Sequence, residues 1–195
     1  HIESGKSARS LDVTDSDLES IQDLHLLTSK PILYVCNVDE NTMKSGNKHV
    51  DAVKEVVKEE DAEILLIATA IESEISELDD FEEQQMFLEE MGLKKPGVHH
   101  LIQSTYKLLN LQTYFTAGVK EVRAWTITKG MKAPQAAGVI HTDFEKGFIR
   151  AEVISYNDFS TLESELACKE SGKMKIQGKD YIVEDGDVMH FLFNV

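Results

Sequence analysis

Two apolar segments with an amphipathic segment between them constrain the fold more than any other feature of this sequence. Residues 32–38, ILYVCNV, and residues 62–70, AEILLIATA, have the composition of strands that are buried on both faces of a sheet. Residues 46–60 between them place their valines on one side of a helix. Strand, helix and strand in succession predict a parallel crossover unit and therefore an α/β fold. Ligands of such sheets bind at the carboxyl ends of the strands, so the residues after each strand are the first candidates for a site.

The remaining sequence predicts a helical part followed by a β-rich part. Helical patterns cover residues 11–28, 72–91 and 94–109, and the second of these is strongly acidic. From Thr113 onward, short β-rich segments alternate with helix-like pieces near residues 134–140 and 158–170. The last segment predicts a hairpin in which residues 181–183 pair with residues 188–193 across the turn EDGD. The expected second fold is a small mixed sheet packed on one helix.

The net charge of −15 is concentrated in the first half of the chain. Residues 51–90 hold 15 acidic side chains and two lysines, whereas residues 111–195 hold 12 acidic and 10 basic side chains. Because an acidic surface repels nucleic-acid phosphate, we expect no DNA partner, and any RNA contact must come from the second half. The apolar runs are far shorter than a membrane-spanning helix, and the two cysteines lack CxxC spacing. We therefore expect no membrane partner and a cytoplasmic location.

The phosphate-binding loop that a nucleotide site of this class requires has only a false candidate. Gly5, Lys6 and Ser7 imitate the end of the GxxxxGK[ST] motif, and no other GK[ST] occurs in the chain. A working loop needs an earlier glycine and a strand ahead of it, and this sequence has neither. We expect these three residues to form a turn or a helix end.

Asn37 and Glu40 follow the first predicted strand and are candidates to bind a purine base. The carboxamide of Asn37 offers a donor and an acceptor, the pair that matches the N6 and N7 edge of adenine. The spacing resembles the NKxD element of GTPases, with Glu in place of Asp and without the lysine, which makes adenine admissible. The alternative interpretation is a capped turn that leads to the next helix.

The second predicted strand ends in three small residues, Ala68, Thr69 and Ala70, at the same edge of the sheet as Asn37. Small side chains would let a base approach closely, although small residues at a strand end are also ordinary packing. If the two loops hold one base, Asn37 must be exposed to solvent and must lie next to Thr69.

The second half of the chain contains one set of basic residues that could contact RNA phosphate. The set is Lys120, Arg123, Lys129, Lys132, Lys146 and Arg150. These residues suggest an alternative function, in which residues 111–195 form a non-catalytic module that binds RNA, the ribosome or a regulatory protein independently of nucleotide. An ordinary surface of mixed charge would carry the same residues.

Four longer segments carry a resemblance to a known family. LYVCNVDE (33–40), ELDDFEEQQMFLEEMGL (77–93), residues 113–156 and GKDYIVEDGDVMHFLFNV (178–195) resemble the C-terminal half of the YchF, or Obg-like, ATPase family. The resemblance covers essentially the whole chain. It implies a P-loop ATPase of GTPase ancestry with a helical coiled-coil insertion and a C-terminal TGS domain of ubiquitin-like β-grasp fold. Residues 1–28 would be the end of the insertion, 29–110 the C-terminal part of the G domain, and 111–195 the TGS domain.

The same resemblance implies which residues bind nucleotide and which partners to expect. Asn37 and Glu40 would contact the base with Val38 alongside, and residues 68–70 would form the second base loop. Such proteins bind ATP, and often GTP more weakly, with Mg²⁺, hydrolyse it slowly and associate with the ribosome, as the large subunit or as 70S. The family's phosphate loop, magnesium-binding residues and switch segments have no match in this sequence. We therefore expect a fragment with no catalytic or metal-binding residues, no ATPase activity alone and weak nucleotide binding.

Overall fold

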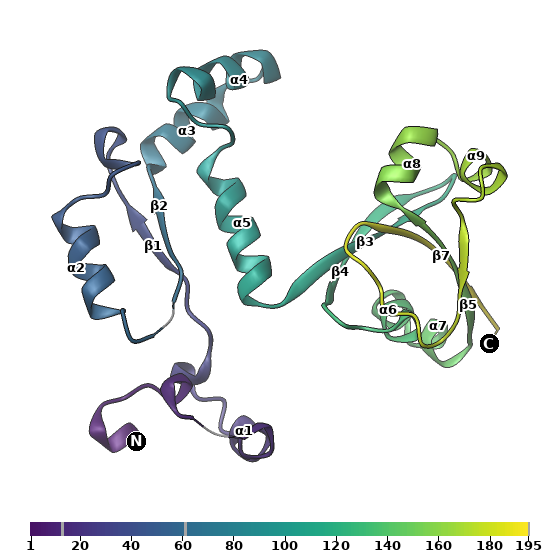
Figure 1. Cartoon of the computed structure of the whole chain (residues 1–195), viewed down its shortest axis with the longest axis horizontal. Helices are drawn as coiled ribbons and strands as arrows, with labels where there is room; N and C mark the ends of the chain where they lie inside the picture. The colour runs from purple at the N-terminus through teal and green to yellow at the C-terminus, as the bar shows by residue number, and fades with distance from the viewer. Residues whose placement is uncertain (13, 61, 195) are drawn as a thin grey trace. The chain divides into compact units, whose positions relative to one another are not determined.

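The computed structural model describes residues 1–12, 14–60 and 62–194, without the side chains of residues 15, 18, 19 and 22. The chain divides into two units, His1–Leu108 and Leu109–Val195 (Figure 1), and each is described by itself. Among the described residues, no helix combines the length and the apolarity that crossing a membrane requires.

The first unit is built around two parallel strands, β1 (Tyr34–Asn37) and β2 (Ile64–Ile67), which are connected by helix α2 (Lys48–Val56). The strands pair along their whole length, and Asn37 lies opposite Ile67 at their carboxyl ends. The predicted parallel crossover is therefore confirmed. Each strand is shorter than the apolar segment that predicts it.

The prediction that these strands are buried on both faces is wrong. Val35 is 47% exposed, and the side chains of β1 alternate between half-buried and exposed. Val35 and Asn37 lie on the same face of β1, and solvent reaches this face, because strand side chains point to the faces of a sheet and not to its edges. Below the carboxyl edge, a hydrophobic cluster is instead formed by Ala68, Ile71, Ile75 and Leu88.

Helices and 3-10 turns supply the rest of the first unit. They are η1 (Ile2–Ser4), η2 (Ala8–Ser10), α1 (Asp15–Gln22), η3 (Leu27–Ser29), η4 (Glu40–Thr42), α3 (Thr69–Glu77), α4 (Phe81–Glu90) and α5 (Gly97–Leu108). The single helix predicted over residues 72–91 is wrong, because it divides into α3 and α4. Asp80 begins α4, since its carboxylate accepts the backbone N–H of Glu82 at 2.8 Å.

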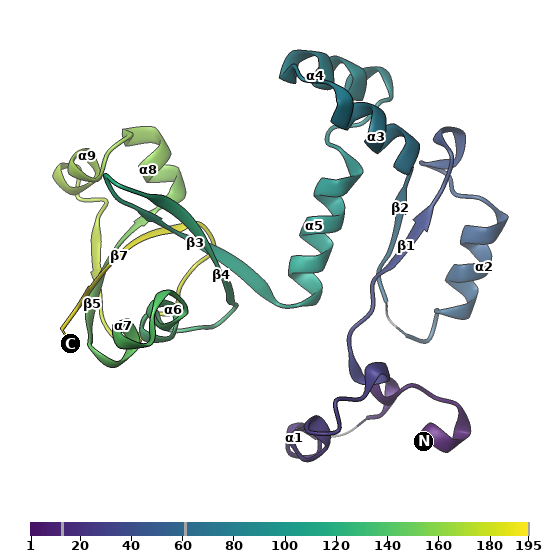
Figure 2. The ribbon, with the colours of Figure 1, turned by 180° about the vertical axis from the view of Figure 1, so that it is seen from behind.

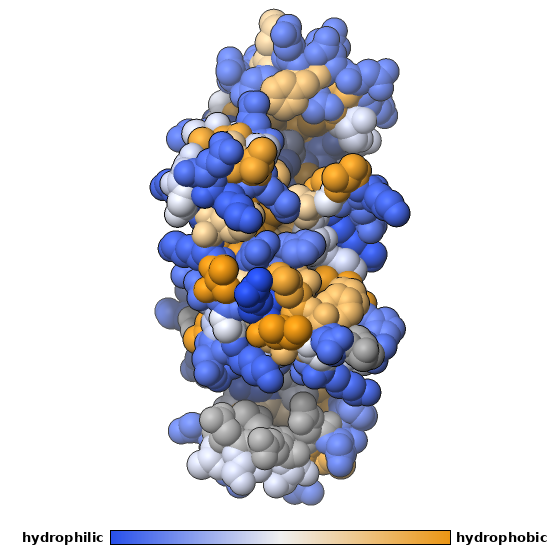
Figure 3. Space-filling view, turned by 90° about the vertical axis from the view of Figure 1, so that its right-hand side faces the viewer, coloured by the Kyte–Doolittle hydropathy of each residue, from blue (hydrophilic) through white to orange (hydrophobic). Residues whose placement is uncertain are grey.

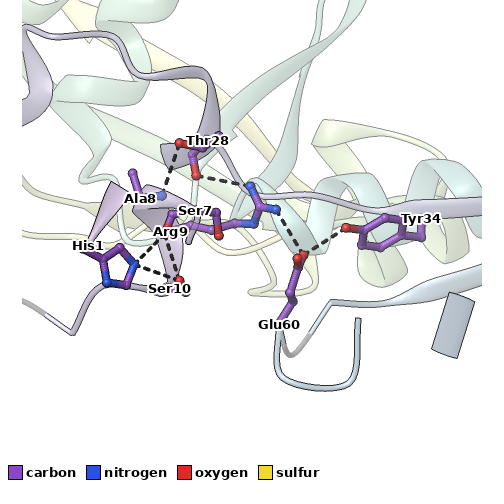
Figure 4. Close-up of polar contacts among 8 residues, drawn as sticks. All are labelled: His1, Ser7, Ala8, Arg9, Ser10, Thr28, Tyr34 and Glu60. Carbon is purple, nitrogen blue, oxygen red and sulfur yellow. Dashed lines mark hydrogen bonds and ion pairs between the residues drawn. The ribbon is translucent and has the colours of Figure 1, made fainter. Parts of the chain in front are cut away.

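An ion pair attaches the N-terminal segment to the strands (Figure 4). Arg9 donates from Nη2 to Oε2 of Glu60 at 3.1 Å and from Nη1 to the carbonyl of Thr28 at 3.2 Å. The hydroxyl of Tyr34, the first residue of β1, donates to the same Glu60 oxygen at 3.0 Å. The hydrogen bonds from Arg9 and from Tyr34 lower the pKa of the Glu60 carboxyl. Residues 1–28 are thus tied to the sheet by charge and hydrogen bonds.

The second unit is a five-stranded mixed sheet. Its strands are β3 (Leu111–Ala117), β4 (Val122–Thr128), β5 (Phe148–Ser155), β6 (Lys175–Gln177) and β7 (Asp187–Phe193), in the spatial order β4-β3-β7-β5-β6. β3 and β7 are parallel, and the other neighbouring pairs are antiparallel. Helix α6 (Ala133–Ile140) follows the second strand, which is the β-grasp arrangement. The predicted fold class is therefore confirmed for both units.

Helices cover both faces of this sheet. One hydrophobic cluster includes Tyr114, Ala136 and Phe191 and lies beneath α6 and α7 (Thr142–Lys146). A second includes Cys168 and Val188 and lies beneath α8 (Tyr156–Leu162) and α9 (Glu165–Glu170). Figure 2 shows the α6–α7 pair and the α8–α9 pair at opposite sides of the strands. The predicted packing on one helix is therefore wrong, and the single helix predicted over residues 158–170 is two helices.

The hairpin predicted for residues 181–193 does not form. Ile182 bridges to Lys132 and not to β7. The loop before β7 is held by β3 instead, because the Thr113 amide donates to Oδ1 of Asp185 at 2.8 Å and the Thr113 carbonyl accepts from the Gly186 N–H at 2.8 Å. β7 then pairs with β3 and β5, which lie on its two sides. The EDGD turn therefore directs β7 into the centre of the sheet.

Candidate functional site

Asn37 and Thr69 meet at the carboxyl edge of the two-stranded sheet. Asn37 is the last residue of β1, and Thr69 is the first residue of α3, two residues beyond the end of β2. Oδ1 of Asn37 accepts from the backbone N–H of Thr69 at 3.2 Å and from the Thr69 hydroxyl at 3.0 Å. Both residues are exposed. The predicted exposure of Asn37 and its predicted proximity to Thr69 are confirmed, and a contact with nucleotide stays a prediction.

These hydrogen bonds determine how the Asn37 carboxamide can meet a ligand. A backbone N–H can only donate, so the atom that faces Thr69 is the carboxamide oxygen, and both of its acceptor positions are used. The amide nitrogen Nδ2 remains as a donor. The predicted bidentate match with adenine is therefore wrong in this arrangement, because the N6 amino group needs an acceptor. Nδ2 can donate to the N7 atom of a purine.

Asp39 and Glu40 follow Asn37 by two and three residues, and their carboxylates have different tasks. Oδ1 of Asp39 accepts from the backbone N–H of Thr42 at 3.1 Å and from the Thr42 hydroxyl at 2.7 Å, which begins η4. The Glu40 side chain is exposed, and no other described residue gives it a hydrogen bond or an ion pair. Glu40 is therefore the carboxylate that a ligand at this edge can reach, whereas Asp39 holds the loop.

The other three predicted base-loop residues differ in exposure. Val38 is 8% exposed, and its N–H donates to the Ile67 carbonyl at 3.0 Å. Ala68 is 2% exposed and belongs to the cluster beneath the edge. Ala70 is exposed. The side chains of Val38 and Ala68 thus support the edge from below, and Ala70 is the small residue that a ligand could approach.

Asn37 also has a structural role that sequence reasoning missed. Ala68 occupies the N-cap position of α3 and has no side chain that could accept a hydrogen bond, so Asn37 supplies the acceptor from the neighbouring strand. Glu72 begins α5 in the same way, because its two carboxylate oxygens accept the N–H groups of Gly97 at 2.6 Å and Val98 at 3.2 Å. No local pattern predicts these caps, since Asn37 and Thr69 are 32 residues apart, and Glu72 and Gly97 are 25 apart.

Two further features concern phosphate and metal binding, namely the false phosphate-loop candidate and the metal-ligating residue types. The false phosphate-loop candidate, residues 5–7, follows η1, where Gly5 has a φ of 81°, so the predicted turn or helix end is confirmed. In the part of the chain that the structure describes, no group of three or more His, Cys, Asp or Glu side chains is placed to hold a metal ion.

The six basic residues of the second unit do not form one cluster. Lys120 lies two residues before β4, Arg123 is its second residue and Lys129 lies directly after its end, whereas Arg150 is on β5. β4 and β5 are three strand spacings apart in the sheet, which is about 14 Å. Of the other two, Lys132 pairs with Asp180 at 2.8 Å, and Lys146 ends α7.

Arg123 stacks on the chain's one tryptophan. The Arg123 guanidinium lies 4.1 Å from the centre of the Trp125 ring, which is half-buried on the same strand. The indole nitrogen of Trp125 donates to the Thr116 hydroxyl at 2.9 Å. This arrangement holds the guanidinium at the surface, three residues along the chain from Lys120. Lys120 and Arg123 are therefore the part of the predicted basic set that could contact one phosphate segment.

Comparisons with known sequences find relatives over the whole length of the chain. A family model named YchF-GTPase_C, with the description "Protein of unknown function (DUF933)", matches residues 111–194. The ribosome-binding ATPase YchF of Bacillus subtilis is 53% identical over 196 residues, which cover 100% of this chain and 53% of the relative. The protein of the same name from Escherichia coli O157:H7 is 53% identical over 194 residues, with the same coverage of both chains. The chain thus spans about half the length of the curated relatives it matches.

Comparisons with solved structures give the same result. The Schizosaccharomyces pombe YchF GTPase is 37% identical, with a TM-score of 0.84 over 97% of this chain and 50% of that chain. A GTP binding protein from Pyrococcus horikoshii, at 15% identity and a TM-score of 0.58 over 94% of this chain and 58% of that chain, shares the fold alone. By sequence and by structure over nearly its whole length, this chain belongs to the YchF family.

Proposed function

We propose that this chain is the base-binding and C-terminal part of a ribosome-binding P-loop ATPase that works in the cytoplasm. The relatives named for ribosome binding and ATPase activity match it over its full length. In this proposal, residues 1–28 end a helical insertion, residues 29–110 end the G domain and residues 111–195 form a TGS domain. The observation that carries the proposal is Asn37, exposed and held by Thr69, three residues before an unpaired Glu40.

The geometry at Asn37 favours a purine, and Glu40 would select adenine. Nδ2 of Asn37 donates to N7, an acceptor that adenine and guanine share, so this contact does not discriminate between them. Beside N7, adenine presents the N6 amino donor and guanine presents the O6 acceptor. A carboxylate accepts from N6 and is repelled by O6. ATP is therefore the proposed nucleotide, and GTP should bind more weakly.

ATP and Mg²⁺ are the proposed cofactors of the full-length protein, and the residues described here act on the base alone. ATP is the nucleotide that the relatives, which are named ATPases, hydrolyse. Asn37 orients the base, Thr69 orients Asn37, and Ala70 leaves room for the ring. Because most of the charge-assisted hydrogen bonds of a nucleotide are made to its phosphates, we propose weak nucleotide binding and no hydrolysis by this chain alone.

Replacing Glu40 with glutamine tests the proposed selectivity. A carboxamide can accept from N6 of adenine or donate to O6 of guanine, so we expect the preference for ATP over GTP to fall by about tenfold. The measurement is isothermal titration calorimetry with both nucleotides on the full-length protein. Glu55→Gln, which removes the same charge from the exposed face of α2, should leave the preference unchanged. An unchanged preference in Glu40→Gln would exclude Glu40 as the selecting group.

The second unit is the proposed ribosome contact, with the large subunit or 70S as the partner. The observation that favours it is the Arg123 guanidinium held over Trp125, with exposed Lys120 three residues earlier in the chain. We expect the double replacement Lys120→Ala and Arg123→Ala to weaken co-sedimentation of the chain with ribosomes about fivefold and to reduce its salt dependence. Lys169→Ala with Lys179→Ala removes the same charge from exposed positions elsewhere in the unit and is the control. Equal losses from both pairs would show that net charge, and not this site, sets the affinity.

A further inference from the structure

Helix α4 exposes hydrophobic side chains that neither the base site nor the core uses. Phe81 is 76% exposed and Met86 is 70% exposed. A groove of about 480 Å³ lies along the helix, with Leu78, Met86 and Phe87 as its apolar lining and with Glu83, Glu89 and Glu90 as its charged lining. The top of Figure 3, where α4 lies, shows hydrophobic side chains surrounded by hydrophilic ones. The groove is therefore apolar in its centre and acidic around it.

The charge around this groove has one sign. Residues 69–90 contain nine carboxylates and no lysine or arginine. Glutamates lie three and four residues before Met86 and three and four residues after it. They are Glu82, Glu83, Glu89 and Glu90. Helical spacing places all four around the exposed methionine. None of the four forms an ion pair with another described residue.

The position of these charges on α4 is unfavourable for the helix itself. Glu89 and Glu90 lie in the last turn, where the helix dipole is negative and favours cations, and this turn has no basic residue. The ammonium of Lys44 lies beside Gly92, two residues past the end of the helix, but it forms an ion pair with neither Glu89 nor Glu90. A cationic partner that pairs with Glu89 and Glu90 would reduce the remaining repulsion at the end of α4.

We propose that this groove binds a basic amphipathic helix from a partner protein. The lysines and arginines of that helix would pair with Glu83, Glu89 and Glu90, and one or two of its apolar side chains would enter beside Met86 and Phe87. Charge complementarity selects a basic partner, and nucleic acid and anionic membranes are repelled by the same carboxylates. Methionine is unbranched and adapts to apolar side chains of different shape, which suits an exposed anchor. This partner site lies beyond the base and ribosome contacts proposed above.

The proposal is tested with a labelled synthetic helix that has leucines on one face and lysines on the other. Its binding to the 195-residue chain is followed by fluorescence anisotropy, and a peptide of the same composition in scrambled order is the control. We expect Met86→Ala to weaken binding about fivefold. The double variant Glu83→Gln with Glu90→Gln should weaken it about tenfold. Glu74→Gln with Glu77→Gln removes the same charge from exposed positions of α3 outside the groove and should change it less than about twofold.

Methyl NMR of the methionines locates the bound helix. The Met86 methyl signal should shift on addition of the amphipathic peptide, whereas that of Met189, 2% exposed in the second unit, should not. Equal weakening by the two double variants, or a Met86 signal that does not respond, would overturn the proposal. In the full-length protein, a Met86 methyl that the peptide cannot reach would show that another segment of the same polypeptide fills the groove, which also overturns it.

Discussion

Replacing Asn37 with aspartate is expected to lower the ATP affinity of the full-length protein about 100-fold while preserving the stability of the first unit. The carboxylate of aspartate can still accept both hydrogen bonds that Thr69 donates. A negative charge at the N-terminus of α3 is also favourable for that helix. What the substitution removes is the Nδ2 donor, and it places an acceptor opposite N7, which is itself an acceptor. Base recognition is therefore lost without loss of the helix cap.

The companion substitution Asn37→Ala removes both functions. We expect it to lower the free energy of unfolding of the first unit by about 1 kcal/mol, because α3 loses the acceptor at its first residue. ATP affinity should fall less than in Asn37→Asp, since alanine adds no repulsion. Calorimetry with ATP on the full-length protein and chemical denaturation of this chain measure the two effects separately.

Asn157→Asp is the matched control for the charge change, because Asn157 is exposed on α8 of the second unit. It should leave ATP affinity unchanged. Wild-type affinity in Asn37→Asp would show that Nδ2 does not contact the base. A loss of stability in Asn37→Asp equal to that in Asn37→Ala would show that the Thr69 hydrogen bonds do not hold α3.

The proximity of the two base loops could be predicted from the sequence because it follows from strand topology alone. A parallel pair brings the carboxyl ends of its strands to one edge, so Asn37 and Thr69 had to be neighbours once their two segments were identified as strands. The sequence could not predict that the Asn37 carboxamide oxygen binds Thr69 and that its nitrogen stays available to a ligand. This arrangement depends on the orientation of the first N–H of α3, which is set by where β2 ends.

The elements that sequence reasoning placed wrongly are those in which a distant partner decides between local alternatives. Residues 181–193 alternate between apolar and polar side chains as a hairpin does. However, the backbone of Thr113 on β3 binds the turn, and β7 then pairs with β3. The division of residues 72–91 is different, because the carboxylate of Asp80 begins α4 through the N–H of Glu82, a local signal within a continuous acidic pattern. The basic residues look like one set in sequence, whereas sheet order separates β4 from β5 by two strands.

Tyr114 is the residue whose loss should destabilise the second unit most. Its side chain is 0% exposed, and its ring meets that of Phe191 edge-on at 5.8 Å between centroids. Its hydroxyl donates to the Ala136 carbonyl at 2.9 Å, which joins β3 to α6. We expect Tyr114→Ala to lower the free energy of unfolding by about 3–5 kcal/mol, because it leaves a cavity in the core cluster. Tyr114→Phe keeps the packing and should cost about 1–2 kcal/mol, since the buried carbonyl loses its donor.

Trp125 is the chain's only tryptophan and lies in the same unit, so its fluorescence during chemical denaturation reports the unfolding of that unit alone. Tyr156→Ala is the control, because Tyr156 is 55% exposed and its loss should cost less than about 1 kcal/mol.

Burial raises the pKa of Tyr114, so the neutral hydroxyl is favoured in the folded state. Its contribution is complete below the ordinary tyrosine pKa of about 10 and is lost as pH rises further. Tyr114→Phe should remove that alkaline loss, and equal destabilisation by phenylalanine and alanine would show that the hydrogen bond, and not the packed ring, holds β3 to α6.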